Sequence, residues 1–140
     1  MGVFRTLSIS GSGLTAERLR MDLIADNLAN VNTTRTEDGG AFRRKMAVFE
    51  PRRVSGAKPG QQATQGVRVQ QIVTQPGPGK MVYDPDHPHA NAEGYVEYPN
   101  INVVSEMVDM ISATRAYEAN VTAINAAKAM ATKALEIGRG

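Results

Sequence analysis

The sequence predicts an α+β fold, in which long N- and C-terminal helices pair as an antiparallel coiled coil, with a small β-rich middle region between them in the sequence. Apolar residues recur every three or four positions near both ends of the 140-residue chain. All seven prolines lie between positions 51 and 99, and glycine is absent from 14–38 and from 95–137. Because Pro and Gly break helices, only the ends are free to form long ones. We therefore divide the chain into an N-terminal helix at 1–32, a β-rich middle region with loops at 33–100 and a C-terminal helix at 101–140, with the two helices forming one coiled-coil domain.

A heptad seam predicts the first helix, with six of its eight positions apolar. The Ser/Gly-rich stretch Ser8–Gly13 forms helix poorly, so we expect it to fray or bend. The helix ends in Asn30–Thr34, whose short polar side chains compete for backbone hydrogen bonds. The apolar seam residues are Leu7, Leu14, Met21, Ile24, Leu28 and Val31.

Strands and turns are predicted for the middle region. Loops rich in Pro and Gly are expected at 55–60 and 75–79. Few large apolar residues are available there, so we expect a small β unit with little core. The predicted strands are Phe42–Phe49, Val67–Val73, Met81–Tyr83 and Tyr95–Tyr98.

The last helix is predicted from Val103 to Ile137, about 50 Å long. Asn102 is a suitable N-cap, and Glu106 and Asp109 near the start suit the helix dipole. Eight of ten seam positions are apolar: Val103, Met107, Met110, Tyr117, Val121, Ile124, Ala131 and Leu135.

Alanine dominates the last helix away from this seam. Only Arg115 and Glu118 carry charge between Ser112 and Ala127, whereas a solvated face normally carries Glu and Lys. Two helices cannot cover all these small-residue faces, so we expect a multi-subunit helical packing, with terminal helices largely unstructured in the free monomer. The simpler alternative is that Ala is the best helix former.

Composition excludes several classes of protein. A net charge of +2 does not describe a nucleic-acid binder, and the absence of Cys excludes disulfides and thiolate catalysis. We see no apolar run that could act as a cleaved secretory signal or a membrane span. No catalytic or nucleotide-binding motif is present, so we expect no enzyme and no cofactor.

Two short stretches hold candidate binding residues. Asp84–His89 contains two Asp and both His of the chain, which are possible metal ligands, but no other ligand cluster accompanies them. We therefore favour a rigid surface connection there. Five basic residues fall between positions 43 and 53, namely Arg43, Arg44, Lys45, Arg52 and Arg53. We favour a solvated or subunit-facing strand over an anion-binding surface for them.

Four blocks of the sequence carry a resemblance to a known family. They are Ser10–Thr33, Tyr83–Pro88, Gly94–Asn102 and Met107–Asn120. Together they resemble the bacterial flagellar axial proteins of the rod and hook, and within that group the proximal-rod subunits of the basal body.

The resemblance implies a structural subunit that polymerises helically through its terminal helices to build the hollow drive shaft. It also implies export through the flagellar type III apparatus without a cleaved signal, and assembly in the rod across the periplasm. The implied partners are copies of itself, the other rod proteins of types B, F and G, and the ring-to-rod junction protein. The seam residues above are then its expected subunit interface.

The sequence is also compatible with one function of a different class, that of a binding module. A small basic β-rich module could bind an anionic partner while the helices serve as a coiled-coil dimerisation stalk. Salt-dependent binding by a discrete dimer would favour that alternative, whereas open-ended polymerisation would favour the rod.

Overall fold

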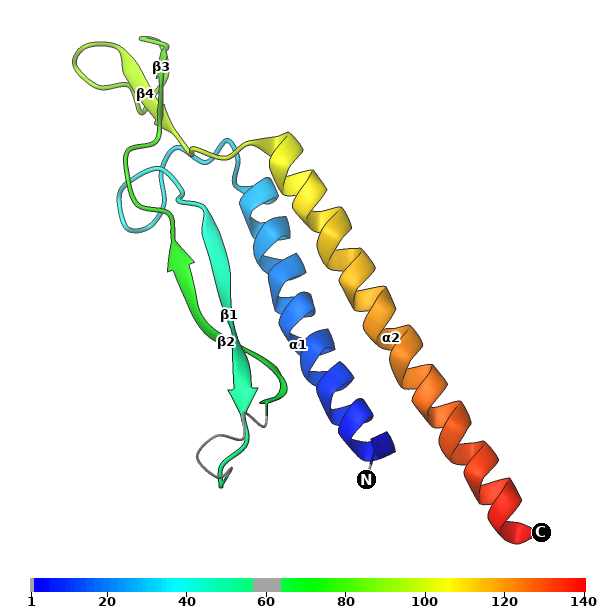
Figure 1. The fold of residues 1–140 in the computed structure, drawn as a ribbon. Helices are drawn as coiled ribbons and strands as arrows, with labels where there is room; N and C mark the ends of the chain where they lie inside the picture. The colour runs from blue at the N-terminus through cyan, green and yellow to red at the C-terminus, as the bar shows by residue number, and fades with distance from the viewer. Residues whose placement is uncertain (1, 57–63) are drawn as a thin grey trace.

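The computed structural model describes residues 2–56 and 64–140, and its two terminal helices run antiparallel to each other (Figure 1). Helix α1 spans Gly2–Ala29 and helix α2 spans Val103–Arg139. Their pairing confirms the predicted fold class. Asn102 caps α2 as predicted, because its side chain accepts a hydrogen bond from the Ser105 amide at 3.1 Å.

Four strands form two separate antiparallel pairs. Strand β1 (Lys45–Arg53) pairs with β2 (Thr64–Thr74), and β3 (Lys80–Tyr83) pairs with β4 (Tyr95–Tyr98). All four predicted strands are thus confirmed, β4 with the predicted bounds and the other three with shifted ends. Of the predicted loop at 55–60, Ser55 and Gly56 form a turn, and the rest lies outside the described residues.

The β1–β2 hairpin lies along α1, and α2 packs on another side of α1 (Figure 1). The shorter β3–β4 hairpin lies at the end of the molecule where α1 ends and α2 begins. The first hairpin contacts α1, and no comparable strand contact with α2 exists between described elements. Helix α1 is therefore the central layer.

The expected bend at Ser8–Gly13 is wrong, because α1 is continuous through this stretch. The small residues there are used for close packing. An added Cβ at Gly13 would lie 2.8 Å from Asn120 Nδ2 of α2. On the hairpin side, Ser12 Oγ accepts a hydrogen bond from the Val67 amide at 3.0 Å. Tertiary contacts on both sides stabilise a helix that its intrinsic propensity disfavours.

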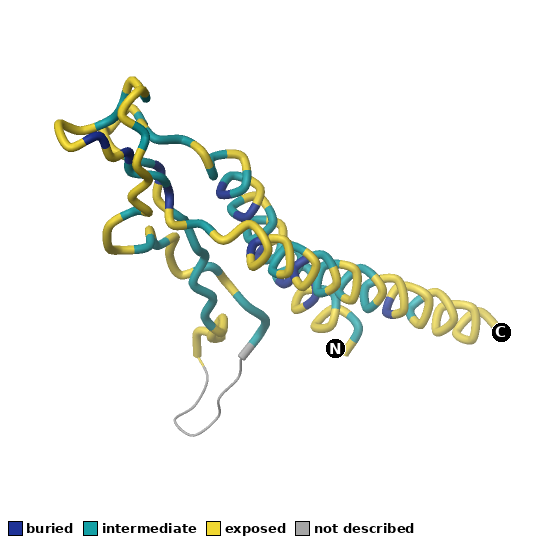
Figure 2. The backbone as a smooth tube through the Cα atoms, turned by 90° about the horizontal axis from the view of Figure 1, so that it is seen from above, coloured by how far each residue is buried: buried dark blue, intermediate teal, exposed yellow. Residues whose placement is uncertain are grey.

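Little of the molecule is buried, as the prevalence of exposed and intermediate backbone in Figure 2 shows. The buried apolar residues of the described chain are Ala16, Ile24, Phe42, Val96, Ala113 and Ala127. Half of them are alanines, so the helix contact is narrow and close. No helix in the described part of the chain combines the length and apolarity needed to cross a bilayer.

Candidate assembly surface

The predicted seam is only partly the surface that joins the two helices. Of the first seam, Ile24 is buried, the other four residues on α1 are half-buried, and Val31, just beyond the end of α1, is also half-buried. On α2, Met110, Tyr117, Val121, Ile124 and Ala131 are half-buried. The remaining three are exposed: Val103, Met107 and Leu135, at 42 %, 55 % and 72 %.

The contact face of α2 is instead centred on a line of residues spaced by seven. Glu106, Ala113 and Ala127 are buried and Asn120 is half-buried. Glu106 is charged, Asn120 is polar and the other two residues are alanines, so none of the four is a large apolar residue. A search for large apolar side chains therefore misses this line, although its seven-residue spacing is visible in the sequence.

A polar cluster joins α1, β1 and α2. Asn27 is 1 % exposed, and its side chain pairs with the backbone of Lys45 at the start of β1 through two hydrogen bonds of 2.9 Å. Asn27 Nδ2 also donates to Glu106 Oε2 at 3.2 Å. Arg44 Nε donates to the other oxygen of Glu106, and Arg44 also bonds Asp109 Oδ2 at 3.4 Å. We call Asn27, Arg44 and Glu106 the polar node.

Glu106 carries the only buried charge among the described residues, being 1 % exposed. A buried carboxylate needs charged and hydrogen-bonding partners, and Arg44 and Asn27 supply them. From sequence, Glu106 was expected only to suit the helix dipole. Its role in the node depends on residues 62 and 79 positions away, so no local sequence signal reveals it.

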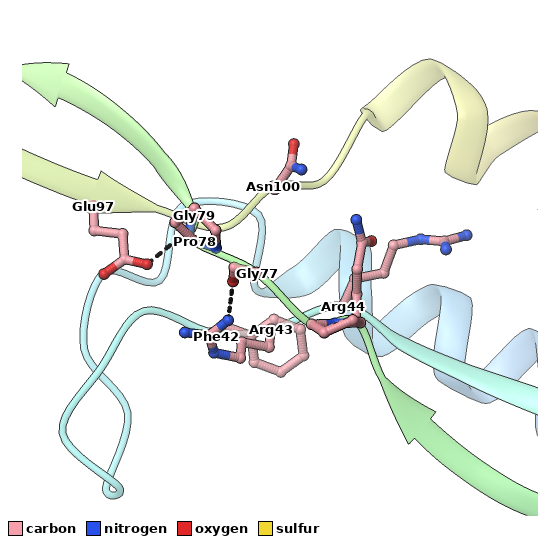
Figure 3. A pocket seen from close by; sticks show the side chains of 10 residues that line it. Phe42, Arg43, Arg44, Gly77, Pro78, Gly79, Glu97 and Asn100 are labelled. Carbon is pink, nitrogen blue, oxygen red and sulfur yellow. Dashed lines mark hydrogen bonds between the residues drawn. The ribbon is translucent and has the colours of Figure 1, made fainter.

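The two hairpins are joined by a braced connection around Gly77–Gly79 (Figure 3). Arg43 donates to the Gly77 carbonyl, and the Gly79 amide donates to Glu97 Oε1 at 2.8 Å. The hollow lined by Arg43, Glu97 and this connection has a volume of about 20 Å³, which is room for roughly one water molecule. This junction is therefore a structural joint and too small for an organic ligand.

The first three basic residues, Arg43, Arg44 and Lys45, and the Asp84–His89 stretch make contacts within the chain, whereas Arg52 and Arg53 are exposed at the end of β1. Arg44 and Lys45 form ion pairs within the chain, Lys45 with Asp26 at 3.1 Å. His89 Nδ1 lies 2.7 Å from Thr34 Oγ1, and the His89 amide donates to His87 Nδ1. No group of three or more His, Cys, Asp or Glu side chains is placed to hold a metal ion in residues 2–56 and 64–140.

Large apolar side chains gather at the surface in three places, in addition to single exposed ones such as Phe4, Ile72 and Met130. The first is the start of α2, where Val104, Met107, Val108 and Ile111 are 55–70 % exposed. We call these four residues the outer stripe. The second is the end of α2, where Leu135 and Ile137 lie in a stretch, 132–140, that is exposed throughout. The third is one face of β3–β4: Met81, Tyr83 and Tyr95.

Comparison with known proteins accounts for both helices. The family model described as "Flagella basal body rod protein" matches residues 7–35, and "Flagellar basal body rod FlgEFG protein C-terminal" matches residues 92–137. The flagellar basal-body rod protein FlgC of Borreliella burgdorferi is 47 % identical over an alignment that covers 100 % of both chains. The chain belongs to the FlgC family. FlgC proteins of Bacillus subtilis and Salmonella typhimurium are 44 % and 41 % identical over 99 % of the chain and 100 % of their own lengths.

Membership of the FlgC family makes the chain a structural component of the flagellar basal-body rod, among the other rod components, and not an enzyme. The alternative of an anion-binding module is not supported. Its basic residues are also divided between intrachain contacts and the far end of β1, so they form no single basic surface.

Proposed function

We propose that the chain polymerises helically through its terminal helices, beside its own copies and the rod proteins of types B, F and G, to build the hollow proximal rod. In this proposal the ring-to-rod junction protein is a further neighbour. The chain reaches the periplasm through the flagellar type III apparatus without a cleaved signal. The family resemblance of the sequence and the exposed apolar surface of the molecule support this proposal.

The amount of exposed surface is the observation that carries it. The chain exposes 9950 Å². A compact monomer of 15.1 kDa exposes about 7,100 Å². The excess is roughly 2,900 Å², more than three times the area of about 800 Å² that one partner contributes to a standard interface. Several neighbours are thus expected to cover each subunit.

The outer stripe is the surface best suited to such a neighbour. Val104 is 70 % exposed, Val108 59 % and Ile111 56 %, and they lie on the face of α2 that points away from α1. Beyond them, exposed Ala119 and Ala126 let another helix approach closely. Exposed Arg115 lies on this face between Ile111 and Ala119, but the rest of the face is lined by apolar and small residues, as is typical of helix-to-helix packing. The predicted seam residues Val103, Met107 and Leu135 are also available to neighbours.

A single substitution on the outer stripe tests the proposal. Ile111→Glu puts a charge where a neighbour is expected, so rods should fail to form and cells should not swim. Because Ile111 is exposed, the helix content of the purified variant should equal that of the original chain. Ile111→Leu, which keeps an apolar side chain, is the matched control and should support swimming. Normal swimming and normal basal bodies in electron micrographs of the Ile111→Glu strain would refute this interface.

A further inference from the structure

The two helices meet through faces that would fit each other in more than one register. The α2 residues that touch α1 follow a seven-residue spacing, and Ala113 and Ala127 on that line are both small. A slide of one heptad in either direction would bring Ala113 or Ala127 opposite Gly13 in place of Asn120, so small residues would still meet there without a steric clash. The packing of small residues alone therefore does not choose between registers.

Two polar contacts do distinguish the registers. Asn120 packs against Gly13, which has no Cβ. The α1 residues seven positions to either side, Thr6 and Arg20, both carry side chains. Fourteen residues further along each helix, Asn27 bonds Glu106. Both contacts belong to the same antiparallel register, two heptads apart. A slide of seven residues in either direction would place Asn120 opposite Arg20 or Thr6, where a side chain occupies the space that Gly13 leaves open.

The polar node adds a reference point outside the helices. The β1–β2 hairpin is fixed to α1 by the bonds of Asn27 to Lys45 and of Ser12 to Val67. Arg44 precedes β1 and so keeps its position relative to α1 when α2 slides. Its ion pair with Glu106 then forms in one register only. The loss of this pair and of the Asn27 bond would disfavour a slipped register.

We propose that the polar node and the Gly13–Asn120 contact set the register of the helix pair, in the way that single polar residues select the register of coiled coils. In an assembly, a neighbour contacts surface from both helices, so every copy needs the same register. The inference concerns the single chain and does not depend on which proteins surround it.

Disulfide trapping tests the register directly, because the chain has no cysteine of its own. Thr114 Oγ1 lies 3.6 Å from Met21 Sδ, so Met21→Cys with Thr114→Cys reports the native register. Met21→Cys with Val121→Cys, or with Met107→Cys, reports a slide of one heptad in either direction. Full-length protein is oxidised at a concentration where circular dichroism shows helix. Denaturing non-reducing gels then separate intrachain from interchain products.

The native pair should be trapped at least about tenfold more than either slipped pair in the otherwise unchanged chain, given the usual cost of unpaired buried polar groups. In the Arg44→Leu/Glu106→Leu/Asn120→Ala background, which removes both partners of the ion pair together, the yields should converge to within about threefold. Lys133→Gln/Glu136→Gln, an exposed ion pair on the same helix, is the control and should leave the yields unchanged.

Two outcomes would overturn the proposal. An unchanged preference for the native pair in the triple background would mean that other contacts choose the register. Loss of helix content in that background would mean that the polar groups stabilise the fold without selecting between registers.

Discussion

Replacement of Ala113 by Leu provides a sharp test of how closely the helices pack. Ala113 is 0 % exposed at the contact between α2 and α1, so there is no room for the three additional carbons of a leucine. Overpacking of this kind costs about 1–3 kcal/mol of stability. Ala and Leu differ in helix propensity by only a few tenths of a kcal/mol, so the expected loss comes from packing.

Ala25→Leu is the matched control, because the same change is made at an exposed position of α1 that lies outside the surfaces assigned to neighbours. We expect it to alter the free energy of unfolding by no more than about 0.5 kcal/mol. Urea unfolding followed by circular dichroism, at one protein concentration where the original chain is helical, measures both variants. Equal unfolding free energies for the two variants would refute the close contact at Ala113.

Three further predictions address the free chain, the hairpin and the end of α2. Helix content of the free chain should rise with protein concentration, because association would cover the excess exposed surface of about 2,900 Å² and so stabilise the helices. A fully helical, sharply melting monomer at high dilution would contradict this. Gly66→Ala should lower the free energy of unfolding more than Gly77→Ala does, by about 1 kcal/mol or more in urea unfolding. Both glycines have positive φ, so both variants carry the same backbone strain. Only at Gly66 would the added Cβ overlap Ser12 and disturb the hydrogen bond between Ser12 and Val67. Leu135→Glu should leave the unfolding of the free chain unchanged, since Leu135 is 72 % exposed, yet abolish swimming; Leu135→Met should preserve it, and swimming by the Leu135→Glu strain would remove Leu135 from the interface.

The sequence alone was sufficient for the secondary structure and the fold class. The seven prolines confined to 51–99 and the glycine-free ends separate the helices from the middle region. Asn102 as N-cap and the strand candidates are confirmed because each depends on nearby residues. Ser8–Gly13 is the instructive exception, since its poor helix propensity is outweighed by packing against Asn120 and the β2 strand.

The tertiary structure decided which face of α2 meets α1 and what holds the contact together. A heptad pattern marks large apolar residues, but the closest approach occurs where side chains are small, at Gly13 and Ala113. The polar node joins residues far apart in the chain, and a buried Glu106 is tolerable only because Arg44 and Asn27 meet it in three dimensions. Helix propensity and periodicity depend on residues that are close together in the sequence. The partners of a buried charge and the distance between two packed helices are determined only when distant segments of the chain come together.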